Sequence, residues 1–174
     1  ALHASFTVSD ETIREAGALA RSFGAGVHVH VAEDAADVAD ARRRGWAGPL
    51  ERLLELDGLP PGSVVAHGVH LDEAQVRRAE AAGLWLVQNP RSNEGNKVGY
   101  PRALAASRHV ALGTDGWASD LELEREALFR LGRAQGDTDA VLEARLGAGR
   151  EMLDVLTGGR HPPALEAGAT ADVV

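Results

Sequence analysis

The chain contains no cysteine and no apolar run long enough to cross a membrane. Without cysteine, disulfide bonds and thiolate metal ligands are excluded, so a metal site would have to use imidazole or carboxylate donors. The first residues carry no signal-peptide pattern. We therefore expect a soluble, cytoplasmic protein without a membrane partner.

The chain also lacks a basic surface, because its formal net charge is −8. Binding to nucleic acid relies on clustered positive charge, which makes a nucleic-acid partner unexpected. The one basic cluster, residues 42–44, follows a stretch with helical character, and we interpret it as a solvated helix end.

With 174 residues, the chain can bury one substantial core, but its two ends are unusual for a domain. Ala1 and Leu2 look like the last residues of a strand, and the sequence LEAGATADVV at the other end looks like the start of a new one. Domain boundaries normally fall in exposed polar linkers. The sequence therefore predicts a piece of a longer chain.

Between these ends, short apolar runs alternate with amphipathic stretches. The runs are continuous rather than alternating, as expected for parallel strands covered by helices. Strands are predicted at residues 26–32, 63–67, 84–88 and 109–113. Helices are predicted at residues 10–23, 35–44, 49–57, 72–82, 102–107, 120–134, 138–148 and 150–156.

Polar residues follow each apolar run at the point where the predicted strand stops. They are His30 and Glu33, then His67, Asn89 and Asp115. In a parallel α/β barrel, active sites are built at this edge. Histidine and carboxylate side chains suit a divalent metal that activates water.

His28 and His30 are two apart on one strand, so their side chains share a face. The pair could bind a metal together, or His30 could be a single ligand with Glu33 as its catalytic partner. A third interpretation makes both histidines core residues. The second is favoured because only about four further strand–helix units fit in the remaining chain, against the eight that close a barrel.

His67 and Asp115 carry open alternatives of their own. A neutral His67 could ligate a metal, or polarise the scissile group and move protons. Asp115, between Gly113 and Gly116, could hold a metal and accept a proton from water, or could belong to a plain turn. Asn89 and Asn93, in the predicted loop NPRSNEGNKVG, are candidates to brace the site, although an Asx-rich loop can also be purely structural.

The motifs HASFTVSDET, HVHVAED, AHGVHL, NPRSN and LGTDG, in this order and spacing, resemble the amidohydrolase superfamily. The resemblance is to its branch of aminohydrolases and chlorohydrolases, which includes S-adenosylhomocysteine, guanine and triazine hydrolases. Within that branch, it is greatest to aminohydrolases associated with selenium-dependent purine catabolism. The resemblance covers essentially the whole chain.

This resemblance implies a role for each site residue. His30 would be the metal ligand of the fifth strand, and Asp115 would ligate the metal and deprotonate water. Glu33 would be the acid/base that moves a proton to the leaving amine. His67 would polarise the reacting centre or touch the metal. His3 would contact substrate, and Asn89 is a second candidate for substrate binding.

The chain also departs from the family pattern. The first-strand His-x-His pair, which supplies two metal ligands in the family, is not in this sequence, and Gln88 stands where relatives commonly have histidine. A divalent metal is implied, zinc first and iron as the alternative. Because two strong ligands are fewer than a catalytic zinc needs, we expect the 174-residue chain to be inactive alone.

The fold predicted is therefore α/β, a partial (β/α)8 TIM-type barrel from the end of strand 4 through strand 8. Residues 1–157 would form the barrel part, and residues 158–174 a linker and the first return strand of a small β-sandwich. The function predicted is metal-dependent deamination of a purine-like or other nitrogen heterocycle. Alternatives are hydrolytic dehalogenation or other C–N hydrolysis on a similar ring, and a non-catalytic half-barrel that needs a partner chain.

Two expectations concern incompleteness and assembly. An open half-barrel should leave the strands at residues 26–32 and 109–113 near its two edges, with an uncovered apolar inner face that favours association. The full-length form is expected to be a homo-oligomer that binds a small heterocyclic substrate.

Overall fold

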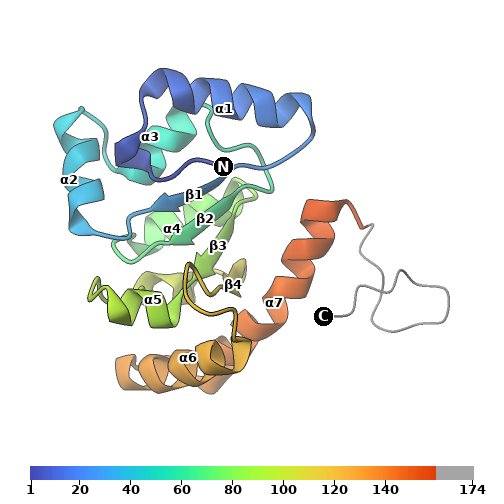
Figure 1. Ribbon diagram of the computed structural model, residues 1–174. Helices are drawn as coiled ribbons and strands as arrows, with labels where there is room; N and C mark the ends of the chain where they lie inside the picture. The colour runs from blue at the N-terminus through green and yellow to red at the C-terminus, as the bar shows by residue number, and fades with distance from the viewer. Residues whose placement is uncertain (160–174) are drawn as a thin grey trace.

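The computed structural model describes residues 1–159, in which all four strands form one parallel sheet. The strands are β1 (His28–Val31), β2 (Val64–His67), β3 (Trp85–Gln88) and β4 (Val110–Leu112). They lie side by side in their sequence order (Figure 1). Each neighbouring pair is parallel. A run of parallel strands in sequence order is the arrangement that a (β/α)8 barrel repeats, as the sequence predicted.

Helices connect and cover these strands. The α-helices are α1 (Asp10–Ser22), α2 (Ala35–Arg43), α3 (Pro49–Glu55), α4 (Glu73–Ala81), α5 (Pro90–Gly95), α6 (Leu121–Gln135) and α7 (Asp139–Thr157). The short 3-10 helices are η1 (Ser5–Thr7) and η2 (Arg102–Ala106). Ser9 and Asp72 cap α1 and α4 through their side chains, because each accepts a hydrogen bond from a backbone N–H of the first turn. Within residues 1–159, no helix combines the length and apolar character that crossing a membrane requires.

The first residues of the chain lie along the edge of β1 that does not pair with β2. Leu2 N–H donates to the carbonyl of His28 at 2.9 Å, and His30 N–H donates to the carbonyl of His3 at 3.2 Å. Ala4 forms a parallel bridge with His30. The opening residues therefore pair with β1, but Ala1 and Leu2, predicted as the end of a strand, do not lie in a strand, and the bridge is at Ala4. In the described residues, β1 and β4 are the outer strands, as expected.

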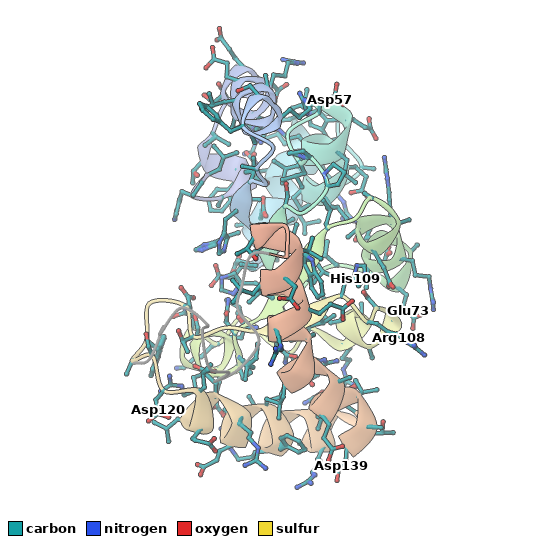
Figure 2. The ribbon with its side chains drawn as sticks, turned by 90° about the vertical axis from the view of Figure 1, so that its right-hand side faces the viewer. Asp57, Glu73, Arg108, His109, Asp120 and Asp139 are labelled. Atoms are coloured by element: carbon teal, nitrogen blue, oxygen red, sulfur yellow. The ribbon has the colours of Figure 1, made fainter. Side chains whose placement is uncertain are left out.

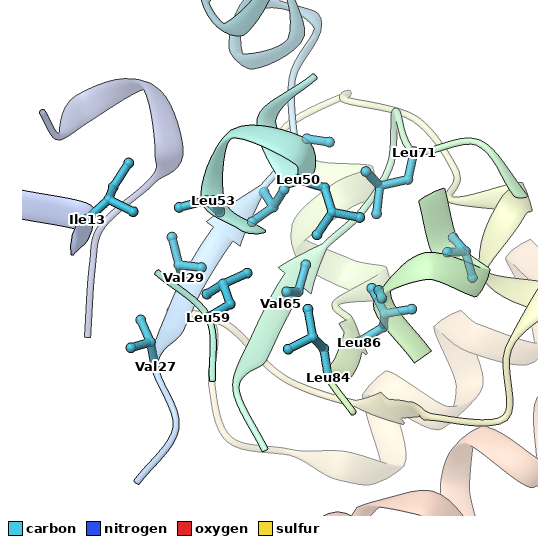
Figure 3. Packing of buried hydrophobic residues seen from close by; sticks show 14 of the residues in the cluster. Ile13, Val27, Val29, Leu50, Leu53, Leu59, Val65, Leu71, Leu84 and Leu86 are labelled. Atoms are coloured by element: carbon cyan, nitrogen blue, oxygen red, sulfur yellow. The ribbon is translucent and has the colours of Figure 1, made fainter. Parts of the chain in front are cut away.

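One face of the sheet carries the larger core, which α1, α3 and α4 cover (Figure 3). Its strand residues alternate with those of the other face, as the two-residue period of a strand requires. They are Val29, Val31, Val65, Leu86 and Val110, with Leu84 directly before β3. From the helices, Ile13, Leu50 and Leu53 are fully buried against them. This packing fixes the positions of the strands and therefore the position of the carboxyl edge at which they end.

The opposite face bears His28 and His30 on β1 and a smaller apolar cluster on β2 to β4. Helix α7 runs across this face (Figure 2). The cluster consists of Val64, Trp85, Val87 and Ala111 from the strands, with Ala148 and Met152 of α7 packed on them. The expectation of an uncovered inner face is therefore wrong for β2 to β4, because α7 buries it. At β1 this face is not covered, but it bears His28 and His30 rather than apolar side chains.

Two predicted elements differ from the observed ones. The segment after Asn89, predicted as a loop, forms the helix α5. Proline is favoured at the first position of a helix because its missing N–H has no partner to lose there, and Pro90 occupies that position. The asparagines and glycine after it led to the prediction of a loop.

The two predicted helices at residues 138–148 and 150–156 are instead one continuous helix, α7. Gly147 and Gly149 led to the prediction of a break. Each interior glycine costs about 1 kcal/mol, which packing can outweigh. Leu142, Arg145 and Ala148 are buried along one side of α7, and that packing carries the helix through both glycines. The predicted sandwich strand lies outside the described residues.

Candidate metal and catalytic site

The polar residues predicted to meet at the carboxyl edge of the sheet do meet there. His30 lies on β1 and Glu33 directly after it, while His67 ends β2. Asp115 follows β4 by three residues. His67 Nε2 lies 3.5 Å from Glu33 Oε2 and 3.7 Å from Asp115 Oδ2. Side chains from residues as far apart in the sequence as His30 and Asp115, 85 positions, therefore lie around one small site.

His30, Glu33 and His67 form a group that could hold a metal ion. Their ligand atoms all lie within 4.8 Å of one another. His30 Nδ1 is 3.9 Å from Glu33 Oε2. The two imidazole rings meet edge to face, with centroids 4.8 Å apart. Asp115 approaches the group through its contact with His67 Nε2.

The tautomer of His67 follows from its contact with Asn93. His67 Nδ1 lies 2.8 Å from Asn93 Oδ1, and an amide oxygen can only accept, so Nδ1–H must be the donor. The Nδ2 of Asn89 is farther from the same nitrogen, at 3.5 Å. In a neutral ring this leaves Nε2 with a free lone pair. That atom is buried and has no hydrogen-bond partner among the described residues.

The backbone of His67 explains why its ring reaches the site. By strand alternation, His67 should share the face of Val65, which packs in the larger core. Its φ of 75° lies in the left-handed region and breaks that alternation. The ring consequently lies against His30, which faces the other side of the sheet.

Three of the non-glycine residues with positive φ lie at this edge: Ala32 (52°), His67 (75°) and Asp115 (53°). A side chain in this region costs about 1–2 kcal/mol, and such residues gather at functional sites. Ala32 is held by Asp37 on α2, whose Oδ2 accepts from the Ala32 N–H at 2.6 Å. Burial raises the pKa of Asp37, while hydrogen bonds from Ser5 and Ala32 act against that rise.

Asp115 is oriented by two donors. Ser92 Oγ–H donates to Oδ2 at 2.5 Å, and Gly116 N–H donates to Oδ1 at 2.7 Å. Burial acts to raise the pKa of Asp115, but these two hydrogen bonds and the nearby histidines outweigh it. The result is a pKa below the ordinary value, so the carboxylate form is favoured.

The surroundings of His30 favour its neutral form. Burial lowers its pKa first, His67 lowers it further, and Asp115 and Glu33 partly offset both effects. A neutral imidazole is the form that ligates a metal. Partial burial of its ring, and then His30, also lower the pKa of His28, but no metal-binding group among the described residues includes His28.

His3 and Asn89, predicted to bind substrate, lie on two sides of the group. The ring of His3 is 5.7 Å from that of His30, and its Nδ1 is 3.1 Å from Thr7 Oγ1. Asn89 is buried next to His67. A β-carbon on Gly113 would lie 2.5 Å from Asn89 Oδ1, so glycine is needed there for Asn89 to fit.

Sequence reasoning missed two residues of this site, Ser92 and Asn96. Both lie on α5, where Ser92 reaches Asp115 and Asn96 Nδ2 donates to Glu33 Oε1 at 3.3 Å. Their four-residue spacing places them on one side of a helix, and the Asn-Pro pair before them was the available start signal. Gln88, noted at the position where relatives have histidine, instead accepts from Arg145 Nη1 at 2.7 Å.

These residues fit a divalent metal. Imidazole nitrogens and carboxylate oxygens are donors that zinc takes in hydrolytic sites. The unpartnered Nε2 of His67, fixed from behind by Asn93, resembles a ligand oriented by an outer hydrogen bond.

Comparisons with known proteins bear on this arrangement. A model of the amidohydrolase family matches residues 1–160. A 5'-deoxyadenosine deaminase from Methanopyrus kandleri is 33% identical over 125 residues, which cover 70% of this chain and 29% of that protein. A 5-methylthioadenosine/S-adenosylhomocysteine deaminase from Desulforudis audaxviator is 31% identical, over 99% of this chain and 42% of its own length.

Among solved structures, an adenosine deaminase from Xanthomonas campestris with bound zinc superimposes with a TM-score of 0.79 at 30% identity. The match covers 98% of this chain and 41% of that one. The predicted fold class is thereby confirmed. The chain spans less than half the length of each of these proteins.

Proposed function

Because the chain belongs to the amidohydrolase family, we propose that the carboxyl edge of its sheet contributes to metal-dependent deamination of a purine-like heterocycle. The relatives named above are deaminases of adenosine derivatives, which supports this reaction and substrate class. The observation that carries the proposal is the buried, unpartnered Nε2 of His67, which faces the carboxylates of Glu33 and Asp115.

In this proposal His30 and Asp115 hold the metal, with His67 beside them. Zinc is the metal proposed, since the donors suit it and the Xanthomonas protein was solved with zinc, and iron is the alternative. When bound, the metal would supply Lewis-acid activation of the attacking water.

The reaction replaces an exocyclic C–N bond by a C–O bond, consumes one water and releases ammonia. Glu33 carries one proton of the water to the leaving amine, and Asp115 accepts the other as the water attacks and passes it on to a ring nitrogen, so that the product is the neutral lactam and the carboxylate is restored. Its lowered pKa keeps Asp115 ionised, as an acceptor must be. His67 polarises the reacting centre, held in place by Asn93.

Substrate would be contacted by His3, which is exposed at the rim of the site beside His30. Asn89 was predicted to take the same role. Its burial next to His67 favours a positioning role instead, by packing against the imidazole ring. The substrate contact of His3 and the positioning role of Asn89 are both part of the proposal.

The test compares Glu33→Gln with Asp115→Asn. Glu33→Gln should retain metal and lose about 10²–10⁴-fold in turnover, because the amide keeps the shape but cannot carry a proton. Asp115→Asn should lose both metal and rate. Metal content is measured for each protein, and ammonia release is measured with aminated heterocycles as substrates. Both measurements are made on the 174-residue chain and on the longest protein that its gene encodes.

Glu55→Gln, which removes an exposed carboxylate on α3, is the matched control and should change neither readout. A panel that includes chlorinated rings tests the leaving group. Release of chloride without ammonia would contradict deamination. Unchanged turnover in Glu33→Gln would contradict the assigned proton carrier.

A further inference from the structure

Helix α5 and its C-cap residue carry side chains that hold the candidate site in place. Each of these side chains contacts a different residue of the site: Ser92 contacts Asp115, Asn93 contacts His67, and Asn96 contacts Glu33. A displacement of α5 would therefore change all of these contacts at once. The geometry of the site depends on whatever fixes the position of this one helix.

The helix does not fix its own position. It has six residues, and a helix this short is not stable by itself in water. Its N-cap residue, Asn89, makes no capping hydrogen bond through its side chain with any described residue. The first N–H groups of a helix have no partner inside the helix, so they need an acceptor from elsewhere. The position of α5 must therefore be set by other segments.

Glu124 of the neighbouring helix α6 supplies that acceptor (Figure 1). One oxygen of its carboxylate accepts the backbone N–H of Arg91 at 3.1 Å, and the other accepts the Nε–H of Arg91 at 2.6 Å. Arg91 is the first residue of α5 with an N–H, because Pro90 before it has none. The side chains of Glu124 and Arg91 are 0% and 14% exposed. This buried ion pair thus caps α5 from another helix.

The same arginine reaches the loop that follows Asp115. Arg91 Nη2 donates to the carbonyl oxygen of Ala118, three residues further along the chain. The ring of Trp117 lies directly on α5, where a β-carbon on Gly95 would come within 2.5 Å of it. The ion pair and these loop contacts together hold α5, α6 and the loop after β4 in one arrangement.

We propose that Arg91 and Glu124 are positioning residues, which fix the side chains of α5 against the metal-binding group and Asp115. This inference rests on the proposed function of the site. The net stability that a buried ion pair contributes is small, because desolvation of the two charges offsets most of their attraction. Apolar side chains of similar size would give comparable stability, but their side chains could neither donate nor accept these hydrogen bonds. The pair therefore supplies a defined position of α5.

The test replaces both charges together. The double variant Arg91→Met with Glu124→Leu leaves no unpaired charge in the interior, so its midpoint of urea unfolding should stay close to that of the unchanged protein. Because Asn93 would no longer be held against His67, the ¹⁵N NMR signals of the metal-free His67 ring should show partial protonation of Nε2. Zinc affinity of the longest protein that the gene encodes, measured by competition with a chelator, should fall about 10–100-fold.

The matched control is the double variant Glu94→Gln with Arg130→Gln. It removes an exposed ion pair that joins the same two helices through hydrogen bonds of 2.8 and 2.7 Å. This control should change neither the His67 signals nor the zinc affinity. The histidine signals are read without metal or substrate. A protein that bound no zinc and released no ammonia would therefore contradict the proposed function, while the His67 signals would still decide this inference.

A further substitution tests whether the pair acts through α5. Ser92→Ala should weaken zinc binding in the unchanged protein, since it removes the hydroxyl that donates to Asp115. In the Arg91→Met, Glu124→Leu background it should have little further effect, because groups that act through one another are not additive. Unchanged His67 signals and zinc affinity in the double variant, or an undiminished effect of Ser92→Ala there, would overturn the proposal. A double variant that unfolds would overturn it too, because the pair would then serve stability.

Discussion

Replacing Asn93 by leucine tests how the site sets the tautomer of His67. Asn93 Oδ1 is the acceptor for His67 Nδ1–H at 2.8 Å, and both side chains are buried. Leucine has the same number of side-chain heavy atoms, branched at the same carbon, and no acceptor. The Nδ1–H would lose its partner, while the carboxylates of Glu33 and Asp115 remain 3.5 and 3.7 Å from Nε2. The proton should therefore move to Nε2.

The magnitude follows from the groups left unpaired. A buried donor without its acceptor costs about 1–3 kcal/mol. The variant also removes the unpartnered Nδ2 of Asn93, which offsets part of the loss. We expect the free energy of unfolding to fall by about 1–2 kcal/mol. Affinity for zinc should fall about 10–100-fold, as for other outer hydrogen bonds to metal ligands.

The assay is ¹⁵N NMR of the histidine rings, which distinguishes protonated from unprotonated ring nitrogens, combined with urea unfolding. Asn96→Leu is the control, because Asn96 lies on the same helix and contacts Glu33 rather than His67. It should preserve the His67 tautomer. If Asn93→Leu kept Nδ1 protonated and lost no stability, the Asn93 contact would not set the tautomer.

Two further predictions concern pH and the backbone. Burial, and then the hydrogen bond to Asp137, raise the pKa of Tyr100 above its ordinary value of 10.0. Because the pKa of Tyr100 is higher in the folded state than in the unfolded state, the neutral phenol contributes stability below about pH 10. That contribution is lost as the pH rises through the folded-state pKa. Tyr100 is the only tyrosine, so phenolate absorbance should appear together with alkaline unfolding, and appearance at the pH of free tyrosine in a folded chain would refute this. Ala32→Gly should stabilise the fold by about 1 kcal/mol in urea unfolding, since Ala32 has a φ of 52°. Ala36→Gly, in the first turn of α2, should destabilise it instead, and a loss in both variants would contradict the assignment of strain to Ala32.

The parallel sheet and the convergence of His30, Glu33, His67 and Asp115 could be predicted from sequence. Each strand is a continuous apolar run with a polar residue at its end, and parallel strands end at one edge. This inference needs only local pattern and one topological rule. The family resemblance added the expected roles, and the comparisons bear out the family and the fold class.

The finer geometry could not be predicted because it depends on contacts between distant segments. The left-handed backbone of His67 has no local signal in the sequence, and neither does its bond to Asn93, 26 residues away. Helix α7 continues through Gly147 and Gly149 because it packs on the sheet. Nothing local in the sequence indicates that packing.

The left-handed residues at the carboxyl edge have a consequence for protein engineering. A common route to a more thermostable variant is to place glycine or asparagine wherever a side chain occupies positive φ. Applied blindly, that procedure would choose His67 and Asp115 along with Ala32. A library screened for heat resistance alone should therefore accumulate substitutions at two positions that the proposed reaction needs. Of the three, only Ala32 can be exchanged without deleting a side chain of the proposed site.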